Sequence, residues 1–183
     1  EITPKRPREL ECEVVRFQNN KEKWIAFVGL LNGRPYEIFT GLADDEDGLM
    51  LPKSVTTGKI IRNYHEETGV KTYDFQFTNK YGYKITIEGL SHKFNPEYWN
   101  YAKLISGVLR YGMPIDQIVR LVGTLQLNNE SINNWKMGVE RALKKYIPDS
   151  ADTGQKCPHC GEKLTFTEGC MKCNNCGYSK CGG

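Results

Sequence analysis

Hydrophobic and polar residues alternate along much of the first 90 residues, as they do in strands with one buried face. The clearest case places Tyr73, Phe75 and Phe77 on one side of the chain. The dipeptide Asn32-Gly33 separates two such stretches, and it favours a two-residue hairpin because both positions tolerate a positive φ. The pattern predicts an antiparallel sheet with strands at 10–17, 24–31, 35–40, 59–63, 70–78 and 82–88.

From about residue 95 the hydrophobic spacing becomes helical. Asn95 and Pro96 form a start signal, because asparagine accepts from an unpaired amide and proline needs no partner at the first helical position. Pro114 is predicted to begin a second helix, and a third is predicted from about Glu130 to Tyr146. The apolar stripes are Tyr98, Tyr101, Ala102, Ile105, Val108 and Leu109, then Ile115, Ile118, Val119 and Val122, then Ile132, Trp135, Val139, Ala142, Leu143 and Tyr146. We expect the three helices to cover one face of the sheet.

These patterns predict an α+β fold with a separate tail. The α+β domain is expected to span 1–147, with strands to about 90 and helices over 95–147. Residues 148–156, PDSADTGQK, are polar and rich in turn formers, and we interpret them as a flexible linker. The remaining segment, 157–183, is expected to be a small zinc ribbon.

Composition and charge narrow the class of protein only a little. The formal net charge is +3, which by itself identifies neither a nucleic-acid nor a membrane partner. No run of 18 apolar residues occurs and the N-terminal sequence has no apolar signal segment, so we expect a cytoplasmic protein with no membrane contact. The sequence begins at Glu1 instead of methionine, and we expect it to be a piece of a longer protein or a separately encoded subunit.

Six of the seven cysteines lie in the tail, which favours metal and redox chemistry over a disulfide framework spread through the fold. Two Cys-x2-Cys-Gly motifs are separated by 12 residues, room for a hairpin through 164–166. Four thiolates at this spacing can surround a tetrahedral metal, and the glycines let the backbone turn back toward it. The predicted Zn²⁺ ligands are Cys157, Cys160, Cys173 and Cys176.

Cys170 and Cys181 are then left over, although a structural ribbon needs neither. Two thiols beside a bound metal can cycle between dithiol and disulfide. An alternative assignment makes Cys176 and Cys181 the exchanging pair, with zinc held by Cys157, Cys160, Cys170 and Cys173. The first assignment is favoured because it uses two equivalent motifs.

The chain resembles the C-terminal region of ribonucleotide reductase large chains, particularly the adenosylcobalamin-dependent (class II) type with a cysteine-rich zinc-binding tail. The resemblance lies in RPRELECEVVRF, WIAFVGLLNGRPYEIF, ISGVLRYGMPIDQIV and EGCMKCNNCGYSKCG. It implies an oxidoreductase of deoxyribonucleotide synthesis, and hence of DNA replication, in which Cys170 and Cys181 return reducing equivalents to an active-site disulfide. It also implies that the four zinc-bound cysteines fix the tail.

The same resemblance implies several partners. No segment resembles the catalytic barrel of these reductases, so this chain alone is not expected to reduce ribonucleoside diphosphates or triphosphates. The barrel, with its adenosylcobalamin, is expected in the same or a companion chain. A thioredoxin-like protein or a small dithiol would reload the thiol pair, and homo-oligomers are expected.

Two other functions compete with this one. Zinc ribbons often bind nucleic acid, and lysines surround the cysteines at Lys156, Lys163, Lys172 and Lys180. However, the tail has no arginine and only two aromatic residues, Phe166 and Tyr178, which argues against a nucleic-acid partner. The ribbon could also be a structural or oligomerisation module whose zinc replaces a core too small to hold itself together.

Overall fold

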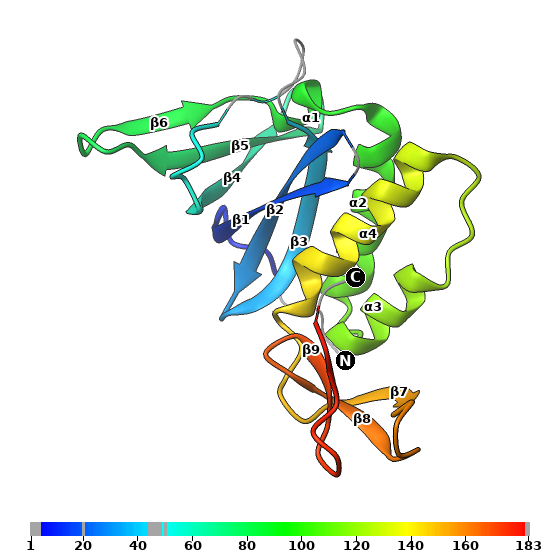
Figure 1. Cartoon of the computed structure of the whole chain (residues 1–183). Helices are drawn as coiled ribbons and strands as arrows, with labels where there is room; N and C mark the ends of the chain where they lie inside the picture. Colours follow the sequence, from blue (N-terminus) through cyan, green and yellow to red (C-terminus); the bar gives the residue numbers. More distant parts are fainter. Residues whose placement is uncertain (1–4, 20, 44–48, 50, 182–183) are drawn as a thin grey trace. The chain divides into compact units, whose positions relative to one another are not determined.

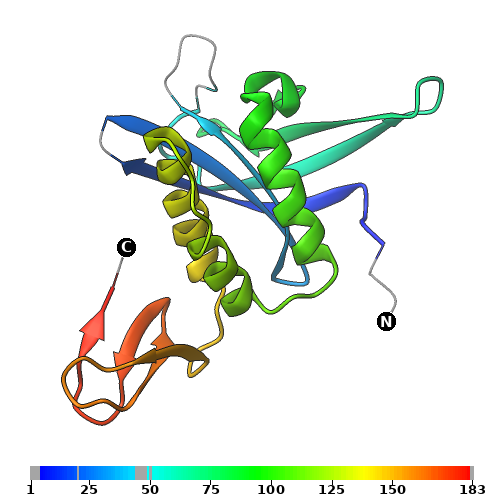
Figure 2. The same ribbon diagram turned by 90° about the vertical axis from the view of Figure 1, so that its right-hand side faces the viewer.

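The computed structural model describes residues 5–19, 21–43, 49 and 51–181 (Figures 1 and 2). The chain divides into two compact units, Glu1–Gly112, here called the sheet unit, and Met113–Gly183, here called the ribbon unit. Together they confirm the predicted α+β class, with a large antiparallel sheet and a small cysteine-bearing ribbon. No helix in the described ranges is long and apolar enough to cross a bilayer.

The sheet unit is built on strands that pair in the order β3-β2-β1-β4-β5-β6, and every neighbouring pair is antiparallel. Asn32 and Gly33 have φ values of 53° and 78°, which confirms the predicted hairpin. All six predicted strands form, and only the last is shorter than predicted. Their bounds are β1 Glu9–Asn19, β2 Glu22–Leu31, β3 Arg34–Leu42, β4 Thr57–His65, β5 Val70–Thr78 and β6 Lys84–Ile87.

Two helices complete the sheet unit, α1 (Leu90–Lys93) and α2 (Pro96–Arg110). The Asn95 side chain accepts from the Glu97 N–H, which confirms the predicted start of α2. Helix α2 packs on β3. Ser106 lies one helical turn after Ala102, and its hydroxyl accepts a hydrogen bond from the Ile38 N–H of β3 at 3.0 Å. The α2 stripe is buried as expected, except that Tyr101 and Val108 are half-buried.

A buried ion pair ties the N-terminal segment to the sheet. Arg6 donates twice to the Glu37 carboxylate on β3, with Nε at 3.0 Å from one oxygen and Nη2 at 2.6 Å from the other. Arg6 is 5% exposed and Glu37 is 1% exposed. Removing one member of such a pair leaves an uncompensated charge in the core.

We therefore expect Glu37→Gln to destabilise the chain by about 3–5 kcal/mol, because Arg6 keeps its charge and loses the carboxylate. Urea unfolding followed by tryptophan fluorescence would measure the change. The matched control is Glu9→Gln, which removes an exposed pair with Lys59 at 3.6 Å and is expected to change stability by less than about 1 kcal/mol. Equal losses in the two variants would contradict a special role for the buried pair.

The ribbon unit begins with two helices, α3 (Ile115–Gly123) and α4 (Glu130–Lys144), which pack against each other. Both were predicted, and α4 ends two residues earlier than expected. Their apolar stripes are buried apart from Tyr146, which is half-buried. Four short strands follow in the order β10-β9-β8-β7. They are β7 Asp152–Lys156, β8 Lys163–Thr167, β9 Cys170–Cys173 and β10 Ser179–Lys180.

The segment 148–156 differs from the expected flexible linker. Residues 152–156 form β7, which pairs with β8, and Ser150 N–H donates to the Phe166 carbonyl at 2.7 Å. Arg120 of α3 donates to the Asp152 carbonyl at 2.7 Å. The segment is therefore part of the ribbon unit, and the boundary between compact units follows Gly112 instead of residue 147. Likewise α3 and α4, expected to cover the sheet with α2, belong to the second unit.

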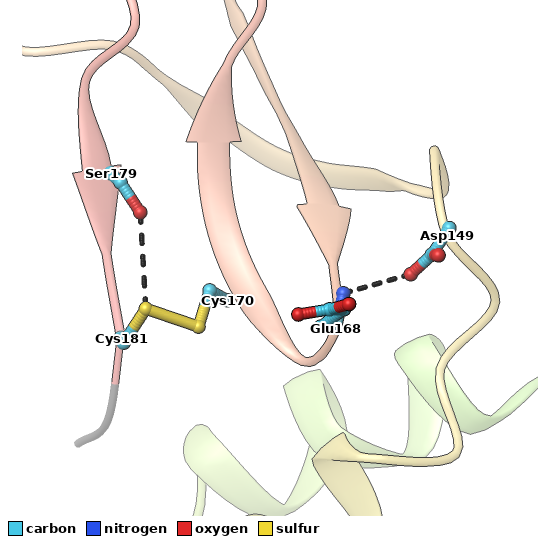
Figure 3. The surroundings of a disulfide bond; sticks show 5 residues. All are labelled: Asp149, Glu168, Cys170, Ser179 and Cys181. Atoms are coloured by element: carbon cyan, nitrogen blue, oxygen red, sulfur yellow. Dashed lines mark hydrogen bonds between the residues drawn. A yellow bond between two sulfur atoms is a disulfide. The ribbon is translucent and has the colours of Figure 1, made fainter.

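The turn between β8 and β9 is also held by residues outside the ribbon. Asp149 accepts from the Glu168 N–H at 2.8 Å (Figure 3). Gly169 has a φ of 76°, and a Cβ built there would lie 3.3 Å from the Lys144 carbonyl oxygen at the end of α4. The ribbon is thus joined to both helices of its own unit.

Candidate metal centre and thiol pair

The two Cys-x2-Cys-Gly motifs fold into equivalent turns. In the first, Gly161 N–H donates to the Cys157 carbonyl at 2.9 Å, and in the second, Gly177 N–H donates to the Cys173 carbonyl at 3.0 Å. The two glycines have φ values of 81° and 80°. These angles are unfavourable for other residues, so glycine at these positions lets each turn bring its cysteines to one point.

Four thiols meet between these turns. The Sγ atoms of Cys157, Cys160, Cys173 and Cys176 all lie within 4.8 Å of one another. The Cys157–Cys176 distance is 3.6 Å and the Cys160–Cys173 distance is 3.4 Å. A tetrahedral zinc ion with Zn–S bonds of about 2.3 Å separates its sulfurs by about 3.8 Å. The cluster could therefore hold a metal ion such as zinc, and the all-thiolate donor set suits that ion.

The electrostatics of the cluster also suit a cation. The backbone of Glu162, helped by the Asn175 side chain and Cys173, lowers the pKa of Cys160 to about 7. For Cys176, the Tyr178 backbone acts in the same direction, but burial and the neighbouring thiols outweigh it and raise the pKa to about 12. One thiolate therefore forms readily, whereas loss of a proton from a second thiol is disfavoured. A bound cation would stabilise several thiolates together and remove this penalty. Sequence reasoning missed the roles of Glu162, two residues after Cys160, and of Asn175, directly before Cys176.

The structure joins Cys170 and Cys181 in a disulfide, with their Cα atoms 4.5 Å apart (Figure 3). The register of β9 with β10 explains this placement: Ser179 pairs with Lys172 and Lys180 pairs with Met171, so the next position sets Cys181 opposite Cys170. Cys170 is half-buried and Cys181 is exposed. The bond can therefore be reached by a thiol from another protein.

The structure thus brings together the favoured sets, four thiols in one cluster and two in a disulfide. It does not bring together the alternative sets, because Cys176 lies in the cluster and Cys170 does not. Strand geometry gives the reason. Cys170 and Cys173 are three positions apart on β9, so their side chains point to opposite faces of the strand.

The model of a family described as the NrdJ homologue C-terminal domain matches residues 10–148, about three quarters of the sequence. The chain belongs to this family. The relation supports the resemblance to the C-terminal region of a class II ribonucleotide reductase. No curated protein and no solved structure matches the chain.

The matched range of the NrdJ homologue C-terminal domain covers nearly the whole six-stranded sheet and the helices α1 to α4, and it ends before Cys157. Family membership therefore rests on a part of the chain that carries none of the six cysteines of the ribbon.

Only a small core supports the ribbon of this NrdJ-related chain. Leu164 and Phe166 are buried, and the buried Thr153 hydroxyl donates to the Leu164 carbonyl at 2.9 Å. His159 lies between Cys157 and Cys160 in the sequence, and its ring is edge-on to the Tyr178 ring with centroids 4.7 Å apart. His159 is outside the thiol cluster, which needs no fifth ligand.

The seventh cysteine of the NrdJ-related chain, Cys12, lies in β1 and is 2% exposed. Burial, with the nearby Glu37 and Glu13 carboxylates, raises the pKa of its thiol well above the ordinary value. It therefore stays protonated and packs as a small apolar side chain.

Proposed function

We propose that this chain is the C-terminal portion of a class II-type ribonucleotide reductase, and that Cys170 and Cys181 pass reducing equivalents to the active-site disulfide. The observation that carries the proposal is an accessible disulfide beside a separate four-thiol cluster, in a chain of the NrdJ homologue C-terminal domain family. The disulfide is the spent form of the carrier in this scheme.

The transfer is a thiol–disulfide exchange in two steps. In the reduced carrier, the Cys181 thiolate attacks one sulfur of the active-site disulfide, forms a mixed disulfide and releases the other sulfur as a thiolate. The Cys170 thiolate then attacks Cys181 Sγ, which frees the second active-site thiolate and closes the Cys170–Cys181 disulfide. Two electrons move to the active site, and each released thiolate takes a proton. Cys181 is assigned the first attack because it is the more exposed sulfur.

In this proposal Cys157, Cys160, Cys173 and Cys176 hold Zn²⁺ as a structural ion. Binding to zinc keeps all four sulfurs ligated, so they do not compete with the carrier pair for exchange. They also fix the β8–β9 hairpin, from whose second strand Cys170 projects.

The proposal includes partners with defined chemistry. A catalytic barrel, in the same or a companion chain, supplies adenosylcobalamin and the active-site cysteines. A thioredoxin-like protein or a small dithiol is oxidised when it reduces the Cys170–Cys181 bond. We place the enzyme in the cytoplasm, where such reductants keep thiols reduced, and a homo-oligomer fits the same scheme.

A nucleic-acid-binding ribbon is less well supported. Lys156, Lys163, Lys172 and Lys180 are all exposed, as such a surface requires. However, the Phe166 side chain is buried and the Tyr178 ring packs on His159, so neither aromatic residue offers a free face for base stacking. A purely structural role for the ribbon would not explain the accessible disulfide between Cys170 and Cys181.

The proposal is tested by the yield of one round of reduction without external reductant. The reductase that contains this sequence is reduced, freed of small thiols and mixed with excess ribonucleotide. We expect about two deoxyribonucleotides per chain from the wild type and about one from Cys170→Ser/Cys181→Ser, since each dithiol supports one turnover. Lys180→Gln is the matched control and should behave as wild type. Equal yields from wild type and the double variant would exclude a carrier role.

A further inference from the structure

A cavity of about 560 Å³ lies in the sheet unit, lined by residues of β3, β4, β5 and one face of α2. Its size falls within the range of about 300–1,000 Å³ typical of small-molecule sites. It contains none of the cysteines discussed above, and its role is independent of the proposed thiol exchange.

One wall of the cavity is aromatic. The rings of Phe39 and Trp99 are stacked with centroids 4.8 Å apart, and the Tyr73 ring lies 5.0 Å from Phe39. Trp99 is half-buried, unlike Trp24 and Trp135, which are at most 2% exposed. An aromatic surface that lines a cavity is a platform on which a planar ring can stack.

The cavity is also strongly positive. Arg62, Lys71, Lys103 and Arg110 line it. The lining carboxylate, Glu37, is already neutralised by its two hydrogen bonds with Arg6. Four cations around one hollow repel one another, and an anion placed between them would relieve that repulsion.

Helix α2 presents these groups in order along one face. Trp99, Lys103 and Arg110 follow at helical spacing, with Gly107 between the two cations. No atom lies within 4 Å of a Cβ built on Gly107, so this face opens onto empty space. The Arg110 guanidinium lies over the Tyr36 ring, 5.3 Å from its centroid, and its Nε is buried without a hydrogen-bond partner among the described residues. Its positive charge therefore has no carboxylate partner there and still contributes to the potential of the cavity that Arg110 lines.

We propose that this cavity binds a small ligand with a planar aromatic ring and several phosphate groups, the chemistry of a nucleoside polyphosphate. The ring stacks on Trp99, and the phosphates bind Lys103, Arg110 and the facing Arg62. Guanidinium and ammonium groups form short, charge-assisted hydrogen bonds with phosphate oxygens, so the phosphates are assigned to the cations and the ring to the aromatic residues.

The test is calorimetric titration of the whole chain with ATP. We expect one ATP per chain, with affinity about tenfold weaker in Lys103→Gln and in Arg62→Gln, the loss of one charge-assisted contact each. Lys84→Gln makes the same charge change on the exposed β6 strand of the same unit and should bind as wild type. Circular dichroism of each variant checks that it is folded.

Two partial ligands test the ring-binding and phosphate-binding parts of the cavity separately. Adenosine and tripolyphosphate should each bind more weakly than ATP, and Trp99→Leu should weaken ATP binding while leaving tripolyphosphate binding unchanged. No saturable ATP binding, or equal affinity in Lys103→Gln and Lys84→Gln, would overturn the proposal. Tripolyphosphate binding as tight as ATP would overturn its aromatic half. A single-stranded oligonucleotide that binds more tightly than ATP and loses affinity in the same variants would assign the site to nucleic acid instead.

Discussion

Replacement of Cys173 by serine is expected to abolish zinc binding and unfold the ribbon, while the six-stranded sheet stays folded. Cys173 is fully buried at the centre of the four-thiol cluster. The apolar side chains that support the ribbon are few, and burial of each contributes only about 1.5–3 kcal/mol. Structural zinc contributes about 10–16 kcal/mol in zinc-finger peptides, so its loss outweighs the remaining contacts.

Two measurements check this expectation. Elemental analysis should give one zinc per wild-type chain and none in Cys173→Ser. Amide hydrogen exchange should show that Leu164 and Phe166, which pair with β9, lose protection in the variant, whereas Phe27 and Phe75 of the sheet keep theirs. Cys181→Ser is the matched control and should keep its zinc. A folded ribbon after removal of metal by a strong chelator would contradict a structural role for zinc.

Reduction is expected to raise the number of titratable thiols from five to seven per chain, counted after denaturation in the presence of a chelator. All seven cysteines lie in the described part of the chain, where five are free and two form the Cys170–Cys181 disulfide. In Cys181→Ser the number should be six under both conditions, because Cys170 has lost its partner. The same variant should no longer be reloaded by an external dithiol, so continuous turnover of the reductase should fall to background.

Cys176→Ser distinguishes the two assignments of the thiols. If Cys170 and Cys181 are the exchanging pair, this variant loses zinc but still gains two thiols on reduction, from four to six. If Cys176 and Cys181 were the pair, the reversible gain would disappear. Retention of zinc together with loss of the reversible gain would reverse our assignment.

The elements of the fold were predictable where the signals are local. The Asn32-Gly33 turn, the Asn95 cap and the alternation around Phe75 each act within a few residues, and the structure confirms all three. Strand β7 was missed because its sequence, Asp-Thr-Gly-Gln-Lys, is polar and forms a strand only through pairing with β8. The Arg6–Glu37 pair was missed for a related reason, since its members are 31 positions apart.

The sequence also predicted which cysteines could meet and favoured the set with two equivalent motifs, but it did not exclude the alternative set. Cys170 and Cys173 repeat the same two-residue spacing as a metal-binding turn, so spacing alone admits both assignments. The choice depends on the β9–β10 register, which places Cys181 across from Cys170. That register is set by the turn between the two strands, in which Gly177 N–H donates to the Cys173 carbonyl at 3.0 Å and Cys173 N–H donates to the Tyr178 carbonyl at 2.8 Å.

The hydrogen bond from Arg120 to Asp152 and the close approach of Gly169 to the Lys144 carbonyl have a kinetic consequence for the proposed thiol exchange. The thiol pair is not attached through a flexible linker, so any movement of Cys170 and Cys181 toward a partner also moves α3 and α4. The rate of the proposed thiol exchange would then be limited by the diffusion of the folded ribbon unit, on the microsecond-to-millisecond timescale of domain motions. Such a step slows with solvent viscosity, whereas the flexing of a short unstructured tail would respond to it far less.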